Sequence, residues 1–247
     1  MKSIKPIIFL LCLIIFASGR SAYAYIVPAE NAKFGKEIVV VHKVRRGDCL
    51  LKIAEFWGAD LKRILEMNNL NIHDKIYPGQ KIKIPTGIFW GKTINYTVQK
   101  GDTVLKIARK FGAFPEQIFH DNNLTPRSLI YPGQILKVAK VIVPQKEVIA
   151  SWYGKDFHGK KAANGKRYDM HKLTAAHRFL PLGMKLKVTY DNKSLVPFLR
   201  VRRSIVVEIT DRGPWVLWRQ LDLSYRAAKR LKGTLIDGIF RVTIETP

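Results

Sequence analysis

Two stretches of the chain repeat the same order of apolar and polar positions at a fixed interval. The segment VRRGDCLLKIA at residues 44–54 corresponds to VQKGDTVLKIA at residues 98–108, which is an offset of 54 residues. The same offset relates the two NNL sequences that begin at Asn68 and Asn122, and the two YPGQ sequences. A register held over three separate motifs indicates a duplicated structural unit.

The apolar spacing within each copy predicts two short helices between two strands. In the first copy, residues 50–57 and 61–65 carry apolar side chains at helical spacing, with Gly58 as a break between them. Alternating apolar positions at residues 39–44 precede these helices, and residues 82–84 alternate in the same way after them. Each unit is therefore predicted to be β-α-α-β.

The repeated motifs resemble the LysM family, in which Gly-Asp-Thr, an Asn-rich motif and Pro-Gly-Gln occur in this order. The resemblance covers residues 41–85 and 94–140. It implies binding of N-acetylglucosamine-containing polymers, here peptidoglycan, in a shallow groove between two loops. The candidate sugar contacts that it implies are Asp48, Asn69, Asp102, Thr103 and Asn123.

Structural roles compete with sugar contact at these positions. Asp48 and Asp102 precede the first helix of each unit, and we favour helix capping for both. The asparagine pairs are also typical of loops. Cys49 replaces Thr103 of the second copy and so removes a hydroxyl that could cap the helix. No histidine beside Cys49 completes a nucleophile, which favours a partly buried structural cysteine.

A third region follows, in which the pattern of the repeats is absent. Alternation predicts strands at residues 148–153, 186–190, 205–209 and 239–244. One helix is expected from Ser224, a good N-cap, through Leu231. Short strands separated by turn-rich segments favour a small β-barrel with few helices.

Short motifs in this region carry the candidate chemistry. In chain order they are ASWYG (150–154), ANGKRYDM (163–170), LTAAHR (173–178), TDRGP (210–214) and LDLS (221–224). They resemble the rare lipoprotein A family of septal-ring lytic transglycosylases, which implies a double-psi β-barrel over residues 147–247. The expected protein is multidomain, with two small β-α-α-β LysM units followed by a mainly-β double-psi β-barrel.

The resemblance also implies an endolytic transglycosylase. Such an enzyme cleaves between N-acetylmuramic acid and N-acetylglucosamine with formation of a 1,6-anhydro sugar, and the family suggests glycan without stem peptides as substrate. One carboxyl group can serve as acid and then as base, whereas most glycoside hydrolases need two. The family's catalytic aspartate falls on Asp211. His177 is a candidate hydrogen-bond partner for Asp211 or the scissile region, and Asp169 is a third polar candidate.

Each of these residues has a plainer alternative. Asp211 before Arg-Gly-Pro and Asp169 within Tyr-Asp-Met both suit turns, and His177 alone would suit a polar loop or helix position. Trp152 and Tyr153 are candidates for stacking on sugar rings, with core packing as an equal alternative.

One departure from the family pattern leaves other functions open. Lys166 stands where the family commonly has glutamate, and this charge reversal favours an expansin-like protein that binds peptidoglycan without cleaving it. A glycan hydrolase is a further alternative. The hairpin at residues 191–203 is basic, and we expect it to be solvated unless it meets an anionic partner.

The first 24 residues are typical of a secretory signal. Lys2 and Lys5 form a basic start, residues 7–17 are apolar, and Ala22 and Ala24 suit a cleavage site. The 11-residue apolar run is shorter than the about 20 residues of a membrane span. We expect cleavage after Ala24 and a soluble periplasmic or envelope protein with neither a lipobox cysteine nor a transmembrane anchor.

The net charge of +24 predicts that the protein lies next to an anionic partner. Export favours wall polymers over nucleic acid, so peptidoglycan strands are the expected partner, together with divisome proteins. Cys49 is the single cysteine after cleavage and excludes an internal disulfide. His158, His171 and His177 lack an established metal-ligand spacing, and no metal or cofactor is expected.

Overall fold

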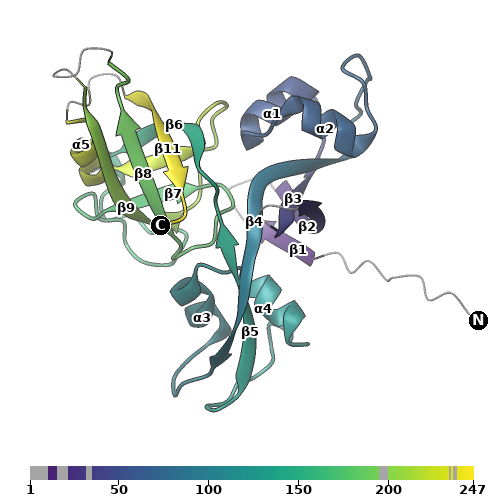
Figure 1. Ribbon diagram of the computed structural model, residues 1–247, viewed down its shortest axis with the longest axis vertical. Coiled ribbons are helices and arrows are strands. Elements are labelled where there is room, and N and C mark those ends of the chain that lie inside the picture. Colours follow the sequence, from purple (N-terminus) through teal and green to yellow (C-terminus); the bar gives the residue numbers. More distant parts are fainter. Residues whose placement is uncertain (1–10, 16–21, 32–34, 195–199, 234, 236–237) are drawn as a thin grey trace, which may run out of the picture.

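The computed structural model describes residues 11–15, 22–31, 35–194, 200–233, 235 and 238–247 (Figure 1). An antiparallel sheet of five strands is ordered β1-β2-β3-β4-β5. Its strands are β1 (Leu11–Ile15), β2 (Ala22–Asn31), β3 (Gly35–Lys43), β4 (Lys81–Thr97) and β5 (Ile135–Ile142). Its helices are α1 (Leu50–Trp57), α2 (Leu61–Asn68), α3 (Val104–Phe111) and α4 (Pro115–Asp121).

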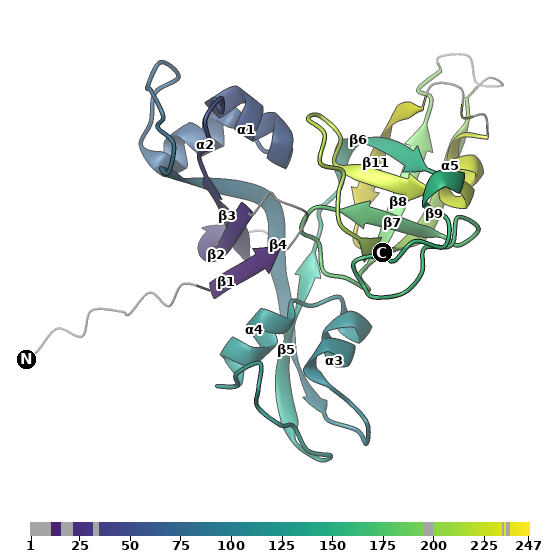
Figure 2. The ribbon, with the colours of Figure 1, turned by 180° about the vertical axis from the view of Figure 1, so that it is seen from behind.

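The predicted β-α-α-β order of each repeat is confirmed, but the two repeats are not separate. β4 pairs with β3 in the first repeat and with β5 in the second, and both views show it running between the two helical pairs (Figures 1 and 2). Residues 86–93, which the sequence pattern leaves between the units, therefore belong to one continuous strand. Bulges near its middle accommodate Gly87 and Gly91 without ending the strand.

The interpretation of Asp48 and Asp102 as helix caps is wrong. Asp48 Oδ2 accepts from the backbone N of Arg45 at 2.8 Å and contacts His42 Nε2 at 2.8 Å. Asp102 Oδ2 makes the matching bond with the backbone N of Gln99 at 2.9 Å. Both aspartates thus close the turn before the helix, where their carboxylates are one residue too early to reach the free N–H groups of the first helical turn.

The true N-cap positions are Cys49 and Thr103. Thr103 Oγ1 accepts from the backbone N of Lys106 at 3.2 Å, whereas Cys49 makes no side-chain cap bond. Cys49 is also exposed, so the expectation of a partly buried cysteine is wrong as well. The buried apolar stripe of α1 begins one residue later, at Leu50.

Replacing Cys49 with Thr should raise the free energy of unfolding by about 1 kcal/mol, because it restores the hydroxyl acceptor of the second repeat. Chemical denaturation followed by circular dichroism measures the change. Thr103→Cys is the matched reverse substitution and should lower stability by a similar amount. Equal stability of all three chains would show that neither cap contributes.

The C-terminal region is a closed barrel with strand order β10-β6-β11-β8-β9-β7. Its strands are β6 (Lys146–Tyr153), β7 (Thr174–His177), β8 (Lys185–Asp191), β9 (Arg202–Asp211), β10 (Leu221–Ser224) and β11 (Ile239–Glu245). A short 3-10 helix η1 (Lys155–Phe157) follows β6, and α5 (Tyr225–Lys232) follows β10. Ser224 Oγ caps α5 by accepting from the backbone N of Ala227 at 3.2 Å, as predicted.

The four strands expected from alternation are confirmed as β6, β8, β9 and β11. The two missed strands, β7 and β10, have four residues each and are too short for a period-2 pattern to stand out. They nevertheless close the barrel, because β7 pairs parallel with β9 and β10 pairs parallel with β6. This mixture of parallel and antiparallel pairs is consistent with the expected double-psi barrel.

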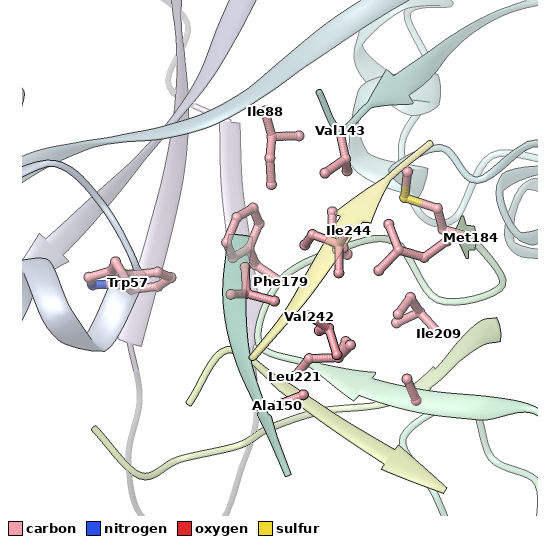
Figure 3. Packing of buried hydrophobic residues seen from close by; sticks show 14 of the residues in the cluster. Trp57, Ile88, Val143, Ala150, Phe179, Met184, Ile209, Leu221, Val242 and Ile244 are labelled. Atoms are coloured by element: carbon pink, nitrogen blue, oxygen red, sulfur yellow. The ribbon is translucent and has the colours of Figure 1, made fainter. Parts of the chain in front are cut away.

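The first repeat and the barrel share one hydrophobic core. Trp57 of α1 packs against Phe179 of the barrel with ring centroids 6.0 Å apart and ring planes inclined at 54°, and Figure 3 labels both among the buried residues of this cluster. Lys146 donates from Nζ to the carbonyl of Gly58 at 2.6 Å. Gly58 has φ 60°, and a Cβ there would lie 2.8 Å from Gln220, so glycine permits this close approach.

The second repeat also contacts the barrel, and its Phe114 belongs to the shared core. Arg109 donates to the carbonyl of Asn164 at 3.1 Å. A Cβ on Gly183 would lie 2.7 Å from the backbone oxygen of Arg109. The segment expected to link the repeats to the barrel is also packed, because Val143 N donates to Thr246 Oγ1 at 2.6 Å.

Only part of the predicted signal segment is described. Residues 1–10 and 16–21 lie outside the described residues, while β1 and β2 pair with each other from Leu11 to Ile26. The expected cleavage after Ala24 falls within β2. The β2 residues that pair with β3 run from Val27 to Asn31, so they lie beyond that bond. Among the described helices, none is long and apolar enough to cross a membrane.

Candidate active site and glycan-binding grooves

Asp211 is the last residue of β9 and its carboxylate is held by backbone groups. Its Oδ1 accepts from the backbone N of Ala163 and of Arg212, both at 2.8 Å. Ala163 belongs to a turn that is itself fixed on the strand, because Asn164 N donates to the carbonyl of Thr210 at 3.1 Å. Within the described chain no hydrogen bond reaches Oδ2, so this oxygen is available to a substrate.

His177 ends β7, which places it beside Asp211, since its neighbour Ala176 pairs with Asp211 across the two strands. The ring is buried, and its Nδ1 accepts from the backbone N of Leu180 at 3.1 Å, which puts the ring proton on Nε2. Burial lowers the pKa of His177 well below its usual value, and the charges of Arg178 and Arg212 add to this effect. His177 is therefore a neutral N–H donor.

The expected hydrogen bond between His177 and Asp211 is not formed, since both of the bonds that Asp211 accepts come from backbone groups. Strand pairing brings the two residues together without joining them. His177 keeps its second expected role, that of a donor toward the scissile region, as a prediction.

Asp169 has the geometry of a turn residue. Its Oδ1 accepts from the backbone N of His171 at 2.9 Å, and its Oδ2 lies 3.6 Å from Lys172 Nζ. The bond from His171 lowers the pKa of Asp169. None of these contacts reaches Asp211 or His177, so the geometry favours the turn over a catalytic role.

The two aromatic candidates are engaged in packing. Tyr153 lies against Tyr168 with centroids 4.2 Å apart, and Trp152 meets Tyr225 edge to face at 5.8 Å. Burial raises the pKa of Tyr153, and the nearby Tyr168 and Asp211 raise it further. Tyr153 thus lies within electrostatic reach of Asp211, but its ring face is occupied by another ring.

A second carboxyl group near Asp211 has no assigned role in the sequence interpretation. Asp222 of β10 accepts a hydrogen bond from Ser151, which in turn accepts from Arg219 at 3.0 Å. Burial raises the pKa of Asp222, and the charge of Asp211 raises it too, while Arg219 and Arg178 oppose this. The sequence holds one signal for this residue. Asp222 alternates with Leu221 and Leu223, which are buried, as a polar side chain on the opposite face of a strand would.

Lys166 lies in the turn that holds Asp211. It is exposed, and its backbone N donates to Asn164 Oδ1 at 2.9 Å. This bond requires no particular side chain at position 166. Lysine in place of the glutamate expected from the resemblance therefore leaves intact the backbone contact that orients the Asp211 carboxylate.

The basic hairpin is partly neutralised by the protein itself. Arg200 NH2 lies 2.7 Å from Asp191 Oδ2, and this bond lowers the pKa of Asp191 to about 2. Lys193 Nζ contacts Glu147 at 2.6 Å. Residues 195–199 at the tip lie outside the described residues.

A groove lies on the first repeat between its two loops. It has a volume of about 450 Å³ and is lined by Asp48, Cys49, Leu51 and Tyr77, among others. Leu51 is 55% exposed and Tyr77 64%, and their counterparts in the second repeat, Leu105 and Tyr131, are 53% and 63% exposed. These residues were missed by the sequence interpretation, although the 54-residue offset relates each pair.

The polar candidates of the repeats have mainly structural tasks. Asn69 and Asn123 adopt left-handed backbone conformations with φ 53° and 55°, and Asn69 is the C-cap of α2. This geometry is consistent with the structural alternative, while sugar contact by either residue stays a prediction. The Thr103 hydroxyl caps α3. Asp48 lines the groove while it closes its turn.

The histidines expected not to bind metal fall into two places. His158 and His171 lie edge to face with centroids 5.8 Å apart, whereas His177 is held by backbone groups in the barrel. The described residues contain no group of three or more His, Cys, Asp or Glu side chains arranged for a metal ion.

Comparison with known families matches both regions. Residues 145–244 match the family model of lytic transglycolases, and residues 42–85 and 96–139 each match the LysM domain.

Curated relatives match part of the chain. A probable endolytic peptidoglycan transglycosylase RlpA of Aquifex aeolicus is 48% identical over 90 residues, covering 36% of this chain and 36% of the relative. Endolytic peptidoglycan transglycosylase RlpA of Pseudomonas aeruginosa is 44% identical over 97 residues, covering 39% of this chain and 26% of the relative. The match thus spans only about a third or a quarter of the relatives' length.

Among solved structures, the spore cortex-lytic enzyme SleL of Bacillus cereus is 26% identical and covers 47% of this chain and 25% of that chain. The TM-score of 0.22 is too low to support an argument.

Proposed function

Since the chain carries two LysM domains ahead of a domain of the lytic transglycolase family, we propose that it is an endolytic peptidoglycan transglycosylase. The observation that carries the proposal is the carboxylate of Asp211, fixed through Oδ1 by two backbone N–H groups and free at Oδ2. A single positioned carboxyl group suffices for this reaction because it can act twice.

In the proposed reaction, Asp211 first protonates the glycosidic oxygen that links N-acetylmuramic acid to N-acetylglucosamine. The bond from the anomeric carbon to that oxygen breaks. The carboxylate then takes the proton from the C6 hydroxyl of the muramic sugar, whose oxygen bonds to the anomeric carbon and closes the 1,6-anhydro ring. The proton that Asp211 gives away is thereby replaced, and no water is consumed.

Three neighbouring residues support this cycle. The backbone bonds from Ala163 and Arg212 hold the carboxylate in one orientation between the two proton transfers. His177 stays neutral and has its Nε2–H available as a donor to the substrate. Arg212 is part of the scaffold, because its guanidinium donates to the carbonyl of Leu180 at 2.9 Å.

The products distinguish the proposal from its alternatives. Purified protein incubated with glycan strands free of stem peptides, and with intact peptidoglycan, should release fragments ending in 1,6-anhydro-muramic acid, as measured by mass spectrometry. Release from the first substrate alone would establish a preference for glycan without stem peptides. Fragments with only reducing ends, or no fragments, would overturn the transglycosylase.

A glycan hydrolase is the second candidate, and Asp222 is the observation that favours it. Asp222 supplies a second carboxyl group within electrostatic reach of Asp211, and burial favours its protonated form. Its engagement with Ser151 and its position beside Arg219 favour a structural role over that of a second catalyst. Products with new reducing ends and no anhydro ends would select this candidate.

We assign attachment to peptidoglycan to the LysM repeats, supported by the exposed Leu51 and Tyr77 of the first and Leu105 and Tyr131 of the second. The predicted signal segment supports a location in the periplasm or envelope. Divisome partners remain a prediction.

Changing Leu51 and Tyr77 together to Ser should weaken binding to insoluble peptidoglycan by about tenfold, which corresponds to about 1.4 kcal/mol. Turnover of short soluble glycan should change little, because the barrel site is untouched. A sedimentation assay and a soluble-substrate assay measure the two effects. Val206→Ser, on an exposed barrel residue, is the control. Equal losses in both assays would contradict this division of labour.

A further inference from the structure

A cavity of about 360 Å³ lies between the first repeat and the barrel. It is separate from the groove of the repeat, with which it shares only Asp48 among the residues that line either cavity. Its volume is at the lower end of the roughly 300–1,000 Å³ of ligand pockets, which suits one or two sugar rings. Its main walls are formed by Arg45, Arg46, Lys52 and Phe56 of the repeat and by Trp215 and Leu217 of the barrel.

The charge of this junction pocket is unbalanced. Arg45, Arg46 and Lys52 face one carboxylate, that of Asp48. Asp48 already accepts from the backbone N of Arg45 and from His42 Nε2. In the described part of the chain, the three cations form no ion pair with a carboxylate, and Lys52 Nζ instead donates to the carbonyl of Gly47 at 3.3 Å.

His42 adds no further charge to the pocket. Its Nδ1 accepts from Trp57 Nε1 at 3.3 Å, so the ring proton lies on Nε2 and is donated to Asp48. Burial lowers the pKa of His42, which keeps the ring neutral near pH 7. The excess of positive charge in the pocket therefore comes from the three long side chains.

The two walls of the pocket are held together by direct contacts. The Arg178 guanidinium of the barrel stacks on the ring of Phe56 at 4.2 Å. Trp218 Nε1 donates to Glu55 at 3.1 Å. These contacts, together with that of Trp57 against Phe179, join the repeat to the barrel beside the pocket.

The pocket is close to the proposed catalytic carboxylate. Trp215 follows Asp211 by four residues, so their Cα atoms are at most about 14 Å apart. The pocket is thus within the reach of a glycan strand of several sugar rings bound at Asp211.

We propose that the junction pocket is a glycan subsite that binds a carboxylate carried by the strand, with the adjoining sugar ring against Trp215. Arginine recognises carboxylates through paired N–H donors, and aromatic faces pack against sugar rings. In peptidoglycan the carboxylate comes either from the lactyl ether of muramic acid or from a stem peptide. The proposal rests on the proposed function, because it places the pocket on the path of the same glycan.

The second repeat lacks this arrangement and supplies a matched control. At the same offset of 54 residues, Gln99 replaces Arg45 and Lys110 replaces Phe56. Lys100 is the counterpart of Arg46 and does not line the pocket. Lys100→Gln lowers the net charge of the protein by the same amount as Arg46→Gln and leaves the junction unchanged.

The test measures binding by calorimetry in the full-length chain carrying Asp211→Asn, so that it is independent of turnover. Three tetrasaccharides are compared: neutral chitotetraose, a muramic-acid-containing strand with free lactyl carboxylates, and the same strand with stem peptides. We expect at least one carboxylate-bearing ligand to bind about tenfold more tightly than chitotetraose. Arg45→Gln with Arg46→Gln should remove this preference. Arg46→Gln alone should reduce it, and Lys100→Gln, which removes the same single charge, should retain it.

Each outcome decides between the possibilities. Preference for the free lactyl form or for the peptide form identifies the source of the carboxylate. Trp215→Ala should weaken the binding of every ligand that enters the pocket. The proposal is overturned if all three ligands bind equally tightly. It is also overturned if the arginine variant weakens the binding of chitotetraose as much as it weakens the binding of the charged ligands. Failure of the function itself would appear separately, as absence of products from the unmodified chain.

Discussion

Replacing Asp211 with Asn should lower the rate of glycan cleavage by roughly 10²–10⁴-fold, the usual contribution of a general acid-base residue. The amide retains an oxygen that can accept from Ala163 and Arg212, so the loop geometry and the fold should persist. It cannot donate a proton to the glycosidic oxygen and regain one from the C6 hydroxyl. Release of anhydro-muramic fragments, followed over time, measures the loss.

Two further aspartates make the experiment specific. Asp169→Asn should change the rate little, because the side chain serves a local turn and contacts neither Asp211 nor His177. Asp222→Asn separates the enzyme classes, since a hydrolase with paired carboxylates would lose activity as severely as with Asp211→Asn. Full activity of a folded Asp211→Asn chain would remove Asp211 from the mechanism.

Trp57→Ala should lower the free energy of unfolding by about 3–5 kcal/mol, the usual cost of truncating a buried aromatic residue. Trp57 is 5% exposed and belongs to the core shared by the first repeat and the barrel. The cavity would therefore weaken both regions. Hydrogen exchange should report faster exchange of backbone amides in α1 and also in the barrel strands.

Phe111→Ala is the matched control, since Phe111 is the counterpart of Trp57 in the second repeat. It packs on a separate cluster formed by residues of that repeat. Its loss should speed exchange in α3 and α4 while the barrel amides keep their rates. If Trp57→Ala left the barrel equally unaffected, the first repeat and the barrel would be energetically independent.

The elements that the sequence predicted well are those specified by nearby residues. The stripe from Leu50 to Trp57 and the αL glycine that ends α1 are local features, as are the alternation in β8 and β11 and the Ser224 cap. Capping was misplaced by one residue because Asp48 and Cys49 are both near the helix start. Only the backbone geometry shows that the Asp48 carboxylate faces the preceding turn.

The candidate site was predictable in part. Motif resemblance singled out Asp211 and His177, and parallel pairing of β7 with β9 does bring them together. The motif resemblance did not single out Asp222. The burial of Asp222 and its bond with Ser151 depend on the pairing of β10 with β6, and these strands are far apart in the chain. The neutral state of His177 follows from its burial, which also depends on contacts between distant parts of the chain. The spacing of residues in the sequence therefore does not predict it.

The sequence by itself determined that there are two LysM repeats, where their helices and turns lie, and that a barrel with family motifs follows. These features depend on periodicity and on residues a few positions apart. The tertiary structure alone decided that β4 joins the repeats, that α1 shares its core with the barrel, and that Arg45, Arg46 and Trp215 line one pocket. Such contacts depend on which surfaces pack together over long separations, and no local pattern encodes that choice.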